Sequence, residues 1–146
     1  MESLRQNLDY LIEKHPRLRV LIIRGCSQLP ENICQLKNLI SVCLAYNRLE
    51  SLPASICELK RLQCLILYKN MLKSLPSSLK HLQDLRILDV EDNKFNNIDQ
   101  DILAMPNLEK LLLNGNKLQN KNIIFNKKVR RSTDGVPYDI YSQQLR

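Results

Sequence analysis

The segments that decide the fold are LISVCLAYNRL (39–49), LQCLILYKNML (62–72), LRILDVEDNKF (85–95) and LEKLLLNGNKL (108–118), which follow one another at intervals of 23 residues. All four fit the pattern L-x-x-L-x-L-x-x-N-x-L when Val42, Val90 and Phe95 are taken as apolar equivalents. A repeat with a constant period has to be identified first, because missing it misassigns the whole fold. The pattern predicts one structural unit that is used several times.

A weaker copy, LRVLIIRGCSQ (18–28), precedes these four segments. It keeps the apolar positions but has Cys26 where the others have asparagine, and Gln28 replaces the last apolar residue. Its Leu29-Pro30 pair also arrives two residues earlier than Leu52-Pro53 does in the next copy. We therefore expect five repeats, of which the first has a tighter outer turn.

Together with the connecting segments, such as LPASICELKR (52–61), the repeats read LxxLPxxIxxLxxLxxLxLxxNxL. This pattern resembles leucine-rich repeats, and it is similar to the 23-residue intracellular subtype of Ras-pathway scaffolds and of plant intracellular Ras-group proteins. The resemblance covers residues 18–118. It implies an α/β fold: a right-handed solenoid with a short parallel β-sheet on the concave face and helical or extended turns on the convex face.

The physics of the pattern points to the same arrangement. The alternation Leu65-x-Leu67 predicts a strand with one face turned inward, and the spacing in LP-x-x-I-x-x-L predicts a single tight helical turn. Neither element can bury its apolar face alone, but repeats stacked at the ~4.8 Å spacing of neighbouring strands can do so together. Asparagines at equivalent corners are expected to satisfy backbone groups that the bend leaves unpaired, namely Asn47, Asn70, Asn93 and Asn116.

The two ends of a solenoid have to be covered. Residues 1–17 place Leu4, Leu8, Leu11 and Ile12 on one helical face and predict a capping helix that stops near Pro16. The organisation expected is thus a cap (1–17), five repeats (18–118, starting near 18, 39, 62, 85 and 108) and a C-terminal cap with a basic, partly disordered tail (119–146).

Charge and cysteine content narrow the function. The net charge is +7, but residues 1–116 account for only +2 of it, which disfavours nucleic-acid binding by the repeats. Three glycines cannot build a phosphate loop, and five cysteines without a C-x-x-C spacing suggest reduced thiols, no metal site and no cofactor. We expect a cytoplasmic location, with a nuclear one as the alternative because of the basic run at 127–131.

The variable strand positions face the concave surface, so information for a partner should lie there. We expect no enzymatic activity, no membrane association and a monomer that binds another protein, in intracellular signalling, through a strip that is apolar at one end and acidic at the other. The residues expected to contact the partner are Arg24, Tyr46, Cys64, Ile66, Tyr68, Lys69, Ile87, Asp89, Glu91, Asp92 and Leu112.

Two alternatives stay open. The basic tail could fold back onto the acidic end of the strip and shield it. Alternatively, Lys121, Ile123 and Phe125 resemble a short motif by which regulatory subunits dock a serine/threonine phosphatase, which would make the chain a regulatory or targeting subunit. The same apolar residues are also wanted for the C-terminal cap.

Overall fold

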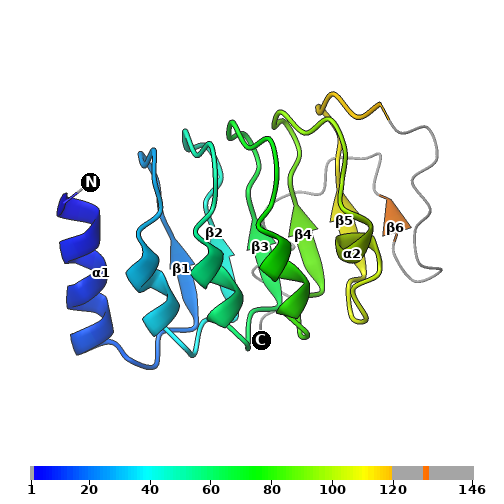
Figure 1. Cartoon of the computed structure of the whole chain (residues 1–146). Helices are drawn as coiled ribbons and strands as arrows, with labels where there is room; N and C mark the ends of the chain where they lie inside the picture. Colours follow the sequence, from blue (N-terminus) through cyan, green and yellow to red (C-terminus); the bar gives the residue numbers. More distant parts are fainter. Residues whose placement is uncertain (1, 120–129, 132–146) are drawn as a thin grey trace.

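The computed structural model describes residues 2–119 and the strand Arg130–Arg131. The chain forms a curved row of coils that begins with the helix α1 (Glu2–Lys14) (Figure 1). Each coil contributes one strand to a parallel sheet whose order follows the sequence. The strands are β1 (Val20–Ile22), β2 (Ser41–Cys43), β3 (Cys64–Ile66), β4 (Ile87–Asp89), β5 (Lys110–Leu112) and β6 (Arg130–Arg131).

The register of the sheet follows the sequence repeat. Leu21, Val42, Leu65, Leu88 and Leu111 pair in one continuous row. The first repeat is shorter than the others, since Val20 pairs with Ser41 whereas Ser41 pairs with Cys64. The predicted fold is therefore present, and the shorter first repeat agrees with the early Leu29-Pro30 pair of the sequence. A sixth strand, β6, lies in the segment that the sequence assigns to the C-terminal cap and tail.

Short helices return the chain along the convex side. Three of them are single 3₁₀ turns that follow a proline, and the Pro-less repeat has an α-helical turn instead, capped by the Asp99 side chain on the Asp101 amide. Their bounds are η1 (Glu31–Gln35), η2 (Ala54–Glu58), η3 (Ser77–His81) and α2 (Gln100–Leu103). A proline with its fixed φ is suited to the start of such a turn.

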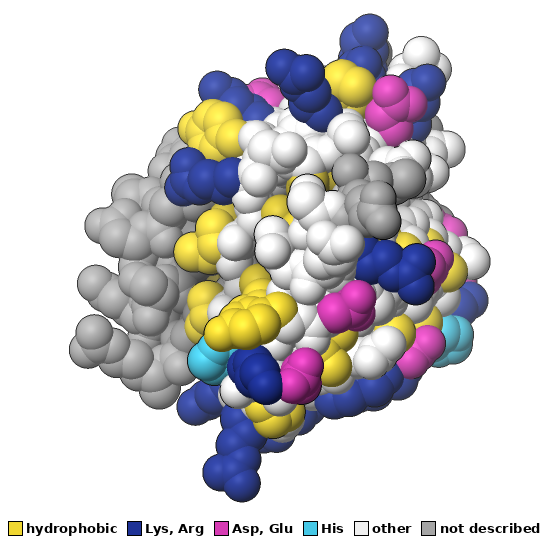
Figure 2. Space-filling view, turned by 90° about the vertical axis from the view of Figure 1, so that its left-hand side faces the viewer, with side chains coloured by type: hydrophobic (Ala, Val, Ile, Leu, Met, Phe, Trp, Pro, Cys, Tyr) yellow, Lys and Arg dark blue, Asp and Glu magenta, His cyan; other side chains and the backbone are white. Residues whose placement is uncertain are grey.

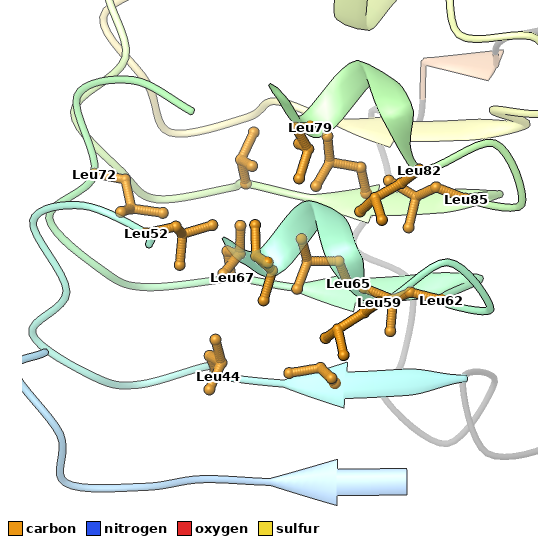
Figure 3. Packing of buried hydrophobic residues seen from close by; sticks show 14 of the residues in the cluster. Leu44, Leu52, Leu59, Leu62, Leu65, Leu67, Leu72, Leu79, Leu82 and Leu85 are labelled. Atoms are coloured by element: carbon orange, nitrogen blue, oxygen red, sulfur yellow. The ribbon is translucent and has the colours of Figure 1, made fainter. Parts of the chain in front are cut away.

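The interior between the sheet and the convex turns is almost entirely leucine and isoleucine. Leu65 of β3 and the residues directly after β2 and β3, Leu44 and Leu67, belong to this core together with Leu59 and Leu79 of the convex side, all fully buried (Figure 3). No single coil encloses this interior, because each side chain packs between its own repeat and the next.

The asparagine at each corner joins its repeat to the preceding one. The Asn70 side-chain amide donates to the Leu67 carbonyl at 2.9 Å and to the Leu44 carbonyl of the preceding repeat at 2.8 Å. Its Oδ1 accepts from the Leu49 amide at 3.0 Å. Asn47, Asn93 and Asn116 repeat this arrangement. The first repeat has no preceding repeat to hold, which explains why Cys26 suffices at this position.

Helix α1 covers the first repeat. Leu8 is buried, and the Asn32 side-chain amide of η1 donates to the Arg5 carbonyl and to the Asp9 carboxylate, at 3.2 and 2.7 Å. At this end of the solenoid, small groups of apolar side chains alternate with charged ones (Figure 2). Helix α1 therefore packs against the first repeat, and it ends before Pro16.

Replacing Asn70 with alanine tests the corner hydrogen bonds. We expect Asn70→Ala to lower the free energy of unfolding by about 1–3 kcal/mol. The substitution leaves the buried Leu49 amide without its partner, and the Leu44 and Leu67 carbonyls keep only the donors from Asn47 and Asn93. Urea unfolding followed by circular dichroism measures this. Asn96→Ala, at an exposed position, is the control and should change the free energy by less than about 0.5 kcal/mol. Equal effects of the two substitutions would contradict a structural role for the corner asparagines.

Candidate functional site

The concave face of the sheet consists of the side chains that alternate with the core positions. The parallel register places them in straight rows across the strands, with Val20, Ser41, Cys64, Ile87 and Lys110 in one row. The next row contains Ile22, Cys43, Ile66, Asp89 and Leu112. The sequence prediction of which residues share this face is therefore confirmed.

Exposure divides this face into two halves. On β1 the apolar side chains are exposed, at 45% for Val20 and 60% for Ile22. From β3 to β5 they are buried, since Ile66 is 2% and Leu112 is 1% exposed. These residues form an apolar cluster separate from the core, which we call the concave cluster and which contains Ala45, Cys64, Ile66, Ile87 and Leu112.

Part of the strip that is expected to contact a partner is therefore not exposed. Cys64, Ile66, Ile87, Asp89 and Leu112 lie on the predicted face but are buried. Burial raises the pKa of the Cys64 thiol to about 12, although a hydrogen bond with Ser41 acts in the opposite direction.

Two tyrosines and a lysine gather where β2 and β3 end. The rings of Tyr46 and Tyr68 meet edge to face with their centroids 5.3 Å apart. The Lys69 ammonium lies 5.2 Å from the centre of the Tyr46 ring and 5.3 Å from that of Tyr68. The hydrogen bond to Tyr68 raises the pKa of Lys69, so the lysine is charged at neutral pH. Aromatic rings beside a cation make a compact anchor for a partner.

At the corners of three consecutive repeats, a residue other than glycine has a positive φ. Tyr46, Lys69 and Asp92 have φ values of 59°, 53° and 49°, and the equivalent positions of the first and last repeats are Gly25 and Gly115. Their amides continue the pairing between repeats, since Tyr46 N–H donates to the Tyr68 carbonyl and Lys69 N–H to the Glu91 carbonyl. Glycine occupies this conformation without strain, so the middle repeats carry side chains at a cost in backbone energy.

Acidic residues follow at the C-terminal side of this corner. Asp92 is exposed and Glu91 half-buried, whereas Asp89 is only 3% exposed and accepts a hydrogen bond from the Glu91 amide. Arg24 lies exposed at the other end of the row. The exposed residues of the predicted site are thus Arg24, Tyr46, Lys69 and Asp92, with Tyr68 and Glu91 half-buried beside them.

Val20 and Ile22 belong to the same open surface, although they were not among the residues expected to contact a partner. They are the most exposed aliphatic side chains of the sheet strands described. The sequence contains them in the apolar row, but it does not show which half of that row is exposed. That information is absent from the repeat pattern.

The remaining predicted site residues, Lys121, Ile123 and Phe125, lie outside the residues that the structure describes. Within the described residues, no helix is long and apolar enough to cross a membrane. In the same part of the chain no group of three or more His, Cys, Asp or Glu side chains could hold a metal ion. His81 lies exposed on the convex turn η3, away from the concave face.

A family model described as "Leucine-rich repeat region" matches residues 2–124. The chain therefore belongs to the leucine-rich repeat proteins. Domains of this fold are generally non-enzymatic modules for protein–protein interaction. A search of the curated proteins finds no match.

Solved structures with the same architecture come from bacteria and plants. A Leptospira interrogans leucine-rich repeat protein is 31% identical over 66% of this chain, with a TM-score of 0.64. The ectodomain of the receptor kinase SOBIR1 from Arabidopsis thaliana is 27% identical over 75% of it, with a TM-score of 0.62. The matches cover only 25% and 65% of those chains.

A third structure contains a bound partner. The Arabidopsis thaliana receptor kinase ectodomain GASSHO1/SCHENGEN3 was solved in complex with CASPARIAN STRIP INTEGRITY FACTOR 2. It is 33% identical over 70% of this chain, with a TM-score of 0.62, and the match covers 13% of that ectodomain.

The left-handed corner makes a prediction about stability. We expect Lys69→Val to lower the free energy of unfolding by about 1–2 kcal/mol, because a β-branched residue is strongly disfavoured at positive φ. Lys73→Val is the matched control, since Lys73 is also exposed but does not have a positive φ. Chemical denaturation of both variants measures the difference. If the two substitutions had the same effect, the corner would not be constrained as described.

Proposed function

We propose that the chain is a non-enzymatic interaction module that binds another protein through the open part of its concave face. The surface consists of Val20, Ile22, Cys43, Tyr46, Tyr68 and Lys69, with Arg24, Glu91 and Asp92 at its margins. The observation that carries the proposal is the exposure of Ile22 and of Tyr46, at 60% and 54%, on adjacent repeats. Apolar and aromatic side chains that stay open beside charged ones are typical of binding surfaces.

The charges of the surface favour a partner segment that is both apolar and basic. An apolar stretch would cover Val20, Ile22 and Cys43, and a basic residue would lie near Glu91 and Asp92. Tyr46 and Tyr68 lie between these two ends and would contact the middle of the segment. The complex of the GASSHO1/SCHENGEN3 ectodomain supports the general idea that a related scaffold holds a partner.

A role in intracellular signalling, a cytoplasmic or nuclear location and a monomeric state belong to this proposal. They rest on the free cysteines, of which none among the five is paired, and on the resemblance to intracellular repeats. Docking of a phosphatase catalytic subunit through Lys121, Ile123 and Phe125 stays the alternative. Under that alternative, deletion of residues 119–146 would abolish binding, whereas binding through the open concave surface needs the repeats.

A capture experiment tests the proposed surface. The full-length chain and an Ile22→Asp/Tyr46→Ala variant are each crosslinked in reducing cell extract, and bound proteins are quantified by mass spectrometry. We expect proteins captured by the parent chain to be reduced at least about tenfold with the variant, because replacing two central side chains of a binding surface together costs more than about 1.4 kcal/mol of binding free energy.

Tyr10→Ala is the control for the capture experiment. Tyr10 is a similarly exposed tyrosine, at 58%, but it belongs to α1 rather than to the concave face. Its removal should leave the captured proteins unchanged. Capture that is reduced by Tyr10→Ala and not by the concave variant would place the interaction on the N-terminal cap and refute the proposal.

A further inference from the structure

Strand β1 is the first strand of the sheet, and one of its edges has no neighbouring strand among the residues described. Its other edge pairs with β2: the Ser41 amide donates to the Arg19 carbonyl, and the Ile23 amide donates back to β2, at 3.0 Å in both cases. Successive residues of a strand turn their backbone groups to opposite edges. The N–H and C=O groups of Val20 and Ile22 therefore point away from β2, towards the open edge.

These backbone groups have no partner within the part of the chain that the structure describes. No described residue donates a hydrogen bond to the carbonyls of Val20 and Ile22 or accepts one from their amides. The two residues are 45% and 60% exposed, so helix α1 does not cover them. An open sheet edge is a template for another strand, and proteins usually block it with a charge, a proline or a covering segment. None of these stands between Val20 and Ile22.

We propose that β1 accepts an extended segment of another protein as an additional strand, and that this segment carries alternate apolar side chains together with acidic residues. The inference goes beyond the proposed function, because the contacts are made by the backbone of the sheet edge and not by the side chains of the concave face. The two sites share only Val20 and Ile22. In such strand addition, backbone hydrogen bonds supply affinity and alternate side chains supply selectivity.

The side chains of the edge define what the added strand has to carry. Val20 and Ile22 lie exposed on the concave face, so every second side chain of the added strand should be apolar in order to cover them. The side chains in between point to the other face of the sheet, on the side where α1 packs against η1 through Asn32. Small side chains such as threonine suit these positions.

The charges around β1 favour an acidic segment. Residues 14–24 contain four basic residues and no Asp or Glu, and all four are exposed: Lys14, Arg17, Arg19 and Arg24. Lys14 forms an ion pair with Glu13, whereas the three arginines form none with the described residues. Acidic residues at the ends of an added strand would lie near these arginines, and complementary charges accelerate association and disfavour wrong partners.

A second copy of the chain fits this edge less well than a single segment. The same arginines would face one another across a pair of β1 strands, and like charges in such positions destabilise strand pairing. Helix α1 also stands beyond β1 at the end of the row of coils (Figure 1), so the convex turns of a second solenoid would have to occupy the space of α1. A single extended segment requires only the space beside β1.

An NMR titration with a synthetic peptide tests the site. The probe is acetyl-Glu-Thr-Val-Thr-Val-Thr-Glu-amide, added to the full-length nitrogen-15-labelled chain at about ten times its dissociation constant, which we expect to be on the order of 1 mM. Amide hydrogen exchange should slow by about tenfold at Val20 and Ile22, because the bound peptide accepts hydrogen bonds from their N–H groups. The amides of Leu21 and Ile23, which face β2, should not change.

Two matched comparisons separate backbone pairing from side-chain contact. N-methylation of both valines, or of the second and third threonines, keeps every side chain of the peptide and removes donors on one of its edges only. One of the two methylated peptides should bind at least about tenfold more weakly than the other, and its identity gives the direction of the added strand. Arg24→Glu should weaken binding at least about threefold, whereas Lys94→Glu, exposed on a distant repeat, should leave it unchanged.

Three results would overturn the inference. Absence of binding, or binding that leaves exchange at Val20 and Ile22 unchanged, would refute the edge site without touching the proposed concave surface. Equal binding of the two methylated peptides would exclude backbone pairing. Slow exchange at Val20 and Ile22 in the free chain would assign the edge to a second copy if the protection disappears on dilution, and to another part of the chain if it persists.

Discussion

The structure depends on one constraint: neither a three-residue strand nor a single helical turn encloses an apolar interior, so each coil is stable only against its neighbours. The leucines of one repeat fill the space left by the next, and the corner asparagine joins the same two repeats through the backbone, as Asn70 does with the Leu44 carbonyl and the Leu49 amide. Packing and hydrogen bonding thus act between the same pairs of coils. A solenoid of this kind gains stability from nearest-neighbour contacts and not from a central core, which is why its first coil requires the cap α1.

Much of the fold could be predicted from the sequence because this constraint is periodic. Leucine recurs wherever a side chain enters the shared interior, and asparagine recurs wherever the corner needs both donors and an acceptor, so the strands, their register and the concave face all follow from the spacing. The capping helix follows from a different pattern, the apolar face that includes Leu4 and Leu8. These predictions concern contacts between residues at fixed sequence separations.

Features that depend on contacts outside the repeat could not be predicted in the same way. The pattern predicts that Ile66 and Leu112 face the concave side, but not that they are buried there, because the spacing of the repeat fixes the direction of a side chain and not its exposure. Strand β6 was missed for a related reason: Arg131 stands opposite Leu111, at a position where the repeat has an apolar residue, and only backbone pairing with β5 shows the strand.

The division between fixed and variable positions also explains where selectivity for a partner can reside. Asparagine, or Cys26 in the first repeat, fixes the backbone path at the corner, so the residue before it keeps the left-handed conformation whether it is Gly25, Gly115 or the larger Tyr46, Lys69 and Asp92. The backbone would adopt this path with less strain if glycine stood at all five positions. Strained non-glycine residues are concentrated at functional sites in proteins generally. Tyr46, Lys69 and Asp92 are therefore not needed for the fold of the solenoid. They place an aromatic, a basic and an acidic side chain on three consecutive corners, at the edge of the open concave surface.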